Sequence, residues 1–189
     1  MGRLGNLEFF TGLLALFTAV LAVSTGLQVW AFVQSERASI APVAAGIDPV
    51  KITTGPIVVY VQIKNSGKDT ALIQESIPNY KILDRLPKFP NYGVVARVSR
   101  AILLPGQTLS TGGIAKVDGK PVMVTEDDVR SINNGEKFLW IYGKVVYRDR
   151  FSVIFGPQII GYCFEYNPAN DFRLGMFNGC GEENYVYTD

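Results

Sequence analysis

The sequence contains no histidine, only two cysteines and almost no excess of charge of either sign. Histidine is the commonest general base and a frequent zinc ligand, so its absence removes the usual routes to acid–base and zinc chemistry. Two cysteines, Cys163 and Cys180, cannot form a CxxC pair or a cysteine-rich zinc site. The 18 basic and 17 acidic residues nearly cancel, which gives no electrostatic reason to expect a nucleic-acid partner.

Phosphate-binding loops are also missing. The segment "GIAKVDGK", beginning at Gly113, resembles a Walker A loop. However, one residue too many separates its glycines, and Pro121 stands where a serine or threonine would bind magnesium. Asp118-Gly119 between apolar flanks is better explained as the turn of a β-hairpin. These absences favour a protein that is not an enzyme and that holds no cofactor and no metal.

A long uncharged segment stands out near the amino terminus. No residue from Phe9 to Val33 carries a formal charge. As a helix this segment would span about 37 Å, more than the roughly 30 Å of a hydrocarbon core. A cleavable signal peptide has a much shorter apolar core, of about 7–15 residues. Aromatic residues, which favour membrane interfaces, flank both ends: Phe9, Phe10, Trp30 and Phe32. We predict an amino-terminal tail over residues 1–8 and an uncleaved transmembrane helix over 9–34.

The orientation of this helix follows only weakly from charge. Arg3 precedes the helix and Arg37 follows it, so the bias in basic residues is small. A short amino-terminal tail before a long carboxy-terminal domain favours export of that domain. We therefore expect a cytoplasmic amino terminus and a domain outside the cytoplasm.

Small residues form a stripe along one face of the predicted helix. Glycine and alanine recur every three or four positions, and threonine repeats every seven beside them: Gly12, Ala15, Ala19, Ala22, Gly26, Thr11, Thr18 and Thr25. Small residues let a second helix approach closely, and threonine hydroxyls bond across such contacts for about 1 kcal/mol or less. The stripe predicts a partner helix, either another copy or a subunit of a membrane complex. The alternative is that these residue types are simply common in membrane helices.

The remainder of the chain predicts a mainly β domain. Residues 35–54 are small, polar and proline-containing, which predicts a tether. Apolar residues then alternate, as in Ile57, Val59 and Val61, and turn residues recur between such runs. About seven short strands predict an immunoglobulin-like β-sandwich over residues 55–166, with an open barrel as the alternative. Residues 167–189, rich in glycine, asparagine and acids, predict a loosely ordered tail.

One short helix is expected within this domain. Thr125 precedes "EDDVRSINNG", and Asp128 follows three residues later, as in a capping box. Asp127 and Asp128 therefore fit a helix start better than a catalytic pair. Glu182 and Glu183 fit a solvated tail, and a calcium site there with Asn170 and Asp171 is the less favoured alternative.

The segment "YGKVVYRDRF", residues 142–151, has the residue types of an active site but the pattern of a strand. Alternation places Leu139, Ile141, Val145 and Tyr147 on one core face. Gly143 predicts a bulge or the close approach of another backbone. Asp149 follows the strand, where its carboxylate is expected to accept bonds from turn amides or to pair with an arginine. A strand running into a turn is the favoured interpretation.

The two cysteines lie seventeen positions apart, Cys163 in a predicted strand and Cys180 in the loop "NGCGEE". In an oxidising compartment we expect a disulfide that pins the tail to the sheet. The alternative is two free thiols. Without histidine to activate it, neither thiol is expected to be a catalyst.

Aromatic residues are concentrated late in the chain. On strands about half of them should fill the core, and an exposed remainder would form a docking patch. Both interpretations stay open for this set: Phe138, Trp140, Tyr142, Tyr147, Phe151, Phe155, Tyr162, Phe164 and Tyr166.

Several motifs together carry a family resemblance. "NSGKDTA", "LLPGQT", a short acidic helix, "IYGKVVYRD" and a late "YCFEY" resemble a loose group of uncharacterised bacterial proteins, frequent in alphaproteobacteria. That resemblance implies one amino-terminal helix in the bacterial inner (cytoplasmic) membrane and a periplasmic, immunoglobulin-like β-domain. Those proteins usually follow Tyr-Arg-Asp with Phe-Gly and a strand bearing histidine and threonine. Here Asp149 is followed by the longer "RFSVIFGPQIIGYC", which has no histidine.

We therefore expect a non-enzymatic, membrane-anchored β-sandwich that acts as an accessory or scaffold subunit of a membrane protein complex. Its expected partners are the lipid bilayer and another transmembrane helix, with no nucleic acid. The alternative function is an extracytoplasmic domain that binds or senses a small ligand.

Overall fold

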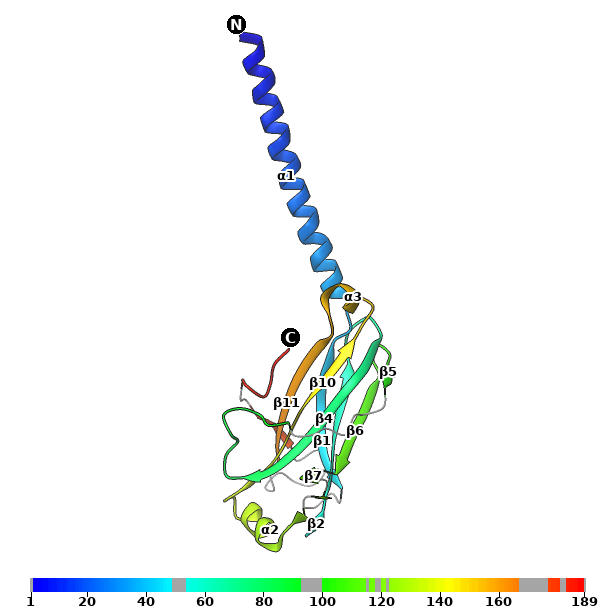
Figure 1. The fold of residues 1–189 in the computed structure, drawn as a ribbon, viewed down its shortest axis with the longest axis vertical. Coiled ribbons are helices and arrows are strands. Elements are labelled where there is room, and N and C mark those ends of the chain that lie inside the picture. The colour runs from blue at the N-terminus through cyan, green and yellow to red at the C-terminus, as the bar shows by residue number, and fades with distance from the viewer. Residues whose placement is uncertain are drawn as a thin grey trace. The chain divides into compact units, whose positions relative to one another are not determined.

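The computed structural model describes residues 2–48, 54–92, 100–114, 116–117, 120–121, 123–166, 177–180 and 183–188. These residues are mainly β, with three α-helices among them. The chain forms two compact units, Met1–Arg37 and Ala38–Asp189. Figure 1 shows the first as a single helix and the second as a set of packed strands.

The first unit is helix α1, Gly2–Glu36. Its segment Glu8–Glu36 is long and apolar enough to cross a membrane, and none of its most apolar window is buried. A helix satisfies the backbone polar groups within the segment, as a hydrocarbon environment requires. The predicted span 9–34 lies within it. The separate tail predicted over residues 1–8 was wrong, because the helix already begins at Gly2.

The second unit contains two main antiparallel sheets (Figure 1). The three-stranded sheet has the order β1 (Ile40–Asp48), β3 (Val58–Asn65) and β6 (Thr108–Ile114). The five-stranded sheet has the order β12 (Phe177–Gly179), β11 (Gln158–Tyr166), β10 (Phe138–Arg148), β4 (Ala71–Leu83) and β5 (Ala101–Leu103). Two short pairs join β2 (Gly55–Pro56) to β9 (Met123–Val124) and β7 (Lys116–Val117) to β8 (Lys120–Pro121).

One hydrophobic core fills the space between the two main sheets. The side chains that alternate along β3, Val59, Val61 and Ile63, are fully buried, as predicted. They belong to the same cluster as Leu139 and Ile141 of β10 on the other sheet. Period-two alternation therefore identified the inward face of both strands, because successive side chains point to opposite faces.

Strand β1 corrects the predicted tether over residues 35–54. Residues 40–48 form an edge strand that pairs with β3 along its length, with Ile47 opposite Val59. The sequence "IAPVAAGID" consists mostly of small residues, so it lacks the alternation of large side chains that marks a strand. The absence of a side chain at Gly46 leaves room for the ring of Tyr60, which lies against it.

The carboxy-terminal tail is more ordered than predicted where the structure describes it. Residues 177–179 extend the five-stranded sheet as β12, and Thr188 forms an isolated bridge to Ile160. Residues 167–176, 181–182 and 189 lie outside the described residues. The predicted hairpin at 116–121 is present as the pair β7–β8, and its turn, Asp118-Gly119, also lies outside them.

Two short helices lie at opposite ends of this unit (Figure 1). Helix α2, Glu126–Asn133, has the predicted capping box. Helix α3, Ser152–Phe155, is unexpected, because "FSVIF" consists mostly of β-branched and aromatic residues, a composition typical of strands. The backbone turns there because Gly156 adopts φ 80° and ends the helix, and the strand β11 begins only at Gln158.

The capping box predicts a measurable loss of stability in Thr125→Ala. The Thr125 hydroxyl accepts a bond from the Asp128 N–H (3.1 Å), and the Asp128 carboxylate accepts one from the Thr125 N–H (3.2 Å). Removing an N-cap side chain costs about 1 kcal/mol, to be measured as the free energy of unfolding in detergent micelles. Thr125→Ser keeps the hydroxyl and should unfold like the parent. Equal losses in both variants would contradict this role.

The same cap predicts a pH dependence. Burial acts to raise the pKa of Asp128, but hydrogen bonds from Thr125 and Lys137 outweigh it and leave the pKa lowered. A lowered pKa in the folded state stabilises the fold above the unfolded pKa, about 3.9, and this contribution disappears as pH falls through the folded value. Asp128→Asn should therefore be less stable than the parent at neutral pH, with a difference that shrinks in acid. A pH-independent difference would contradict the prediction.

Candidate functional site

Strand β10 and the turn after it contain the residues that most resembled a site. β10 pairs with β4 on one side and β11 on the other, so it is the centre of the five-stranded sheet. Leu139, Ile141, Val145 and Tyr147 are buried in the core, which confirms the predicted face. The segment is thus a central strand, and its inward side chains serve packing.

Gly143 marks a close approach and not a bulge. The register shift between β10 and β4 falls between Val146 and Tyr147. A Cβ atom at Gly143 would collide with the carbonyl oxygen of Ile77 and the hydroxyl of Tyr162. That hydroxyl is buried without a hydrogen-bond partner among the described residues, and burial raises the pKa of Tyr162. Glycine is therefore needed because the Tyr162 ring lies where a side chain would be.

Asp149 holds the turn after β10. Its carboxylate accepts bonds from the Ser152 hydroxyl (2.8 Å) and the Gln158 side-chain amide (3.1 Å). The neighbouring Arg150 pairs with Asp69, at 3.5 Å between Nε and Oδ2. The serine and carboxylate thus form a structural turn, with the hydroxyl committed to the carboxylate.

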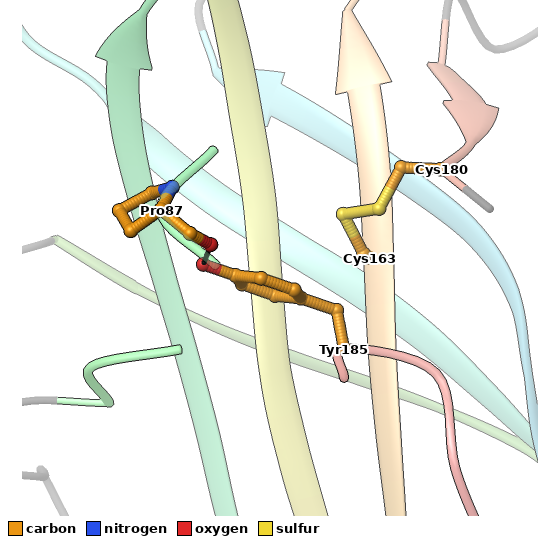
Figure 2. The surroundings of a disulfide bond; sticks show 4 residues. All are labelled: Pro87, Cys163, Cys180 and Tyr185. Carbon is orange, nitrogen blue, oxygen red and sulfur yellow. Dashed lines mark hydrogen bonds between the residues drawn. A yellow bond between two sulfur atoms is a disulfide. The ribbon is translucent and has the colours of Figure 1, made fainter. Parts of the chain in front are cut away.

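The cysteines form the predicted disulfide (Figure 2). Cys163 lies on β11 and Cys180 directly follows β12, with 5.4 Å between their Cα atoms. The Cys180 N–H also donates to the Cys163 carbonyl (3.2 Å). The bond therefore closes the connection between β11 and the short strand at the edge of its sheet.

An aromatic cluster covers the face of β10 and β11 that points away from the core. We call it the outer cluster; it contains Tyr142, Cys163, Cys180 and Tyr185, with Leu86, Tyr92 and Trp140 packed against it. The rings of Tyr142 and Tyr185 meet edge to face at 5.3 Å. Figure 2 shows Tyr185 reaching across the strands to Pro87, whose carbonyl accepts a bond from its hydroxyl at 2.9 Å.

The hydroxyls of Tyr142 and Tyr185 in the outer cluster donate to backbone carbonyls. Burial, with a further effect from Tyr185, raises the pKa of Tyr142 to about 12. Its hydroxyl donates to the Asn91 carbonyl (3.1 Å). Sequence reasoning missed this cluster, because residues 84–92 and 183–188 have no regular pattern. The tyrosines of the otherwise polar tail were the available sign.

The late aromatics divide between the core, with Tyr147, Tyr162 and Tyr166, and the outer cluster, with Tyr142 and Trp140. Tyr142, Tyr147, Tyr162 and Tyr166 are buried. Phe138, Trp140, Phe151 and Phe164 are half-buried. The remaining member of the set, Phe155 of α3, is exposed. The docking-patch interpretation therefore survives only at α3.

The candidate acidic residues do not converge where they are described. Asp127 is exposed and pairs with Arg130 (3.4 Å), and Asp128 caps α2. Glu183 is exposed, whereas Asn170, Asp171 and Glu182 lie outside the described residues. Within the described part of the chain, no group of three His, Cys, Asp or Glu residues is placed to hold a metal ion.

The small-residue stripe lies on α1, whose helical form puts these positions on one face. Nothing lies within 4 Å of where a Cβ of Gly12 or Gly26 would stand. The Thr18 hydroxyl donates to the Leu14 carbonyl of its own helix (2.8 Å). A partner helix stays a prediction.

Comparison with known proteins adds no assignment. Scans against protein-family models, curated proteins and solved structures found no match to this chain. The resemblance to single-pass bacterial proteins therefore stays a prediction.

The close approach at Gly143 predicts a loss of stability in Gly143→Ala. The added methyl would overlap a backbone carbonyl and a buried tyrosine, and overpacking of this kind costs about 1–3 kcal/mol in the free energy of unfolding. Gly179→Ala in β12 is the matched control, because nothing lies within 4 Å of its Cβ position. Similar effects of the two substitutions would contradict the close packing.

The disulfide predicts equal losses in Cys163→Ser and Cys180→Ser. Each removes the same 17-residue cross-link, worth about 3 kcal/mol in the loop-entropy model. The double variant should lose no more than either single variant, and reductant should bring the parent to the same level. Unfolding in micelles measures this, and thiol blocking before a denaturing gel reports the bond in cells. Free thiols in the mature protein would overturn it.

Proposed function

We propose that this protein is a non-enzymatic, single-pass membrane protein whose immunoglobulin-like β-sandwich serves as an accessory or scaffold subunit of a membrane complex. The observation that carries the proposal is the exposed apolar surface of α1. Large side chains such as Leu14, Leu21 and Phe32 are each more than 60% exposed. Each buried side chain of this size gains about 1.5–3 kcal/mol, which a bilayer supplies along the whole helix.

The strand order supports the immunoglobulin-like assignment. If β1, β3, β4, β5, β6, β10 and β11 are taken as seven principal strands, the first, second and fifth form one sheet. The third, fourth, sixth and seventh form the other sheet. In an immunoglobulin fold the third, sixth and seventh strands also share one sheet, and here the fourth strand, β5, lies at the edge of that sheet. One departure is the disulfide, which ties β11 to the segment after β12 instead of linking the two sheets.

The disulfide also supports the location. Such bonds persist in oxidising compartments and are rare in the cytoplasm. A β-sandwich outside the cytoplasm requires a cytoplasmic amino terminus, since a single helix separates the two. We place the protein in the bacterial inner membrane, with the β-domain in the periplasm.

A non-enzymatic role is supported by how the reactive groups are used. Asp149 and Ser152 bond to each other in a turn, and Asp128 caps a helix. Burial raises the pKa of Tyr142 and of Tyr80 to about 12, which makes either hydroxyl a poorer source of phenolate than an exposed tyrosine. The chain also has no histidine.

Purification in a gentle detergent followed by native mass spectrometry tests the accessory role. We expect a stoichiometric protein partner bound to the full-length chain. A lone monomer carrying a small molecule would contradict the proposal and favour a ligand-binding domain. Protease added to intact spheroplasts should cleave the β-domain if it is periplasmic.

The stripe predicts the effect of Ala15→Leu, Ala19→Leu and Ala22→Leu combined. Leucines would hold the two helix backbones apart, and loss of about 2 kcal/mol of packing lowers the association constant more than tenfold. Ser24→Leu with Ala31→Leu is the control, because both positions lie on the opposite face of the helix. An unchanged complex in the triple variant would eliminate the stripe as the contact.

A further inference from the structure

The connection between β10 and β11 carries an exposed apolar turn. In α3, Val153 is 93% exposed, Ile154 77% and Phe155 46%. Exposing neighbouring large apolar side chains to water is unfavourable. Such exposed patches typically mark a surface that binds a protein or a membrane. Figure 1 shows this turn at the end of the β unit remote from α2.

The turn is held firmly in this shape. The Asp149 N–H donates to the Ser152 hydroxyl (2.9 Å), which donates in turn to the Asp149 carboxylate (2.8 Å). The Gly156 N–H donates to the Ser152 carbonyl (3.0 Å) and closes the helix. Asp149 and Ser152 are both buried, so the base of the turn is part of the folded unit. These hydrogen bonds therefore fix Val153 and Ile154 in their exposed positions.

The same end of the β unit receives the chain from α1. The Ile40 N–H donates to the Tyr147 hydroxyl (3.5 Å), which donates to the Gln158 side-chain oxygen (2.9 Å). The Gln158 amide then donates to Asp149 (3.1 Å) at the base of α3. A continuous set of hydrogen bonds thus links the first strand of the unit to the apolar turn.

Chain length brings this end to the membrane surface. α1 ends at Glu36, and only Arg37 precedes Ala38, which is buried in the β unit. Two residues reach at most about 7 Å. The polar layer on each side of a bilayer is of similar thickness, roughly 5–8 Å. With α1 across the bilayer, the entry end of the β unit is therefore tied to the headgroup layer.

Basic residues accompany the apolar turn. Arg148 ends β10, and Lys64 of β3 lies opposite Ala41, near the entry of the chain; both are exposed. The side chain of Arg150 is 61% exposed beside Asp69, and its guanidinium lies 4.7 Å from the centre of the Phe151 ring. Apolar side chains bordered by basic ones are typical of surfaces that bind anionic lipid.

We propose that α3 is a second, interfacial membrane anchor: Val153 and Ile154 insert among the headgroups of the anionic bilayer that holds α1. The inserted side chains fix this end of the β unit against the membrane, about 5–10 Å deep in the headgroup–acyl boundary. The inference rests on the proposed membrane anchoring by α1. It differs from it in naming a lipid contact made by the folded β unit.

Environment-sensitive fluorophores on the full-length chain test the contact. Single cysteines are introduced at Ile154, at Leu21 of α1 and at Asp127 of α2, while the native pair stays in its disulfide. Each labelled protein is reconstituted into vesicles of phosphatidylcholine and phosphatidylglycerol that contain a spin-labelled lipid, with the label near the headgroup for the Ile154 and Asp127 probes and near the end of the acyl chain for the Leu21 probe. Ile154 is 77% exposed and the side chain of Asp127 is 83% exposed, so neither label disturbs the core.

We expect the probe at Ile154 to be quenched several-fold more than the probe at Asp127 and to be shielded from aqueous iodide. Val153→Glu should reduce that quenching to the Asp127 level and leave the Leu21 probe unchanged. If the Leu21 probe is quenched but the Ile154 probe matches Asp127, α1 is an anchor and α3 is not, which overturns this inference alone. If Leu21 is not quenched, the membrane anchoring fails and the inference falls with it. Shielding from iodide without lipid quenching would mean that a second copy covers α3, and would also overturn it.

Discussion

Burial on both faces of β10 is the constraint on which the β unit depends. One face, with Ile141 and Val145, packs against the three-stranded sheet. The other carries Tyr142 and Trp140, which lie in the outer cluster. A strand with only one buried face needs one partner layer, whereas β10 needs a second cover. The loop at 84–92 and the tail at 183–188 supply contacts to it through Tyr92 and Tyr185.

The disulfide and the glycines follow from that constraint. Cys163 and Cys180 belong to the outer cluster. Their bond therefore links the segment after β12 to β11, the strand beside β10. Gly143 and Gly161 are places where a tyrosine ring lies against the strand backbone, Tyr162 on one and Tyr187 on the other. Aromatic rings thus take the space that side chains on the sheet would occupy, which explains why so many tyrosines are buried in a small domain.

Among the described residues, α1 and α3 each leave neighbouring large apolar side chains exposed. They are chemically similar but differ in scale, since one is long enough to cross a bilayer and the other is a single turn. A bilayer accounts for both in the proposals above, because the chain enters the β unit beside α3. The hydrogen bonds of Asp149 with Ser152 and Gln158 fix the position of α3 beside that entry.

The sequence alone determined the features that depend on neighbouring residues. The uncharged run of α1, the alternation along β3 and β10 and the Thr125 cap are local patterns, and each is present in the structure. Tertiary contacts decided the rest. β1 is a strand because β3 offers it hydrogen bonds, although its small residues have no period. α3 is a turn because Asp149 and Gly156 bend a run that reads as a strand. The outer cluster joins segments about a hundred residues apart, Leu86 and Tyr185 among its members, and no local pattern encodes such a contact.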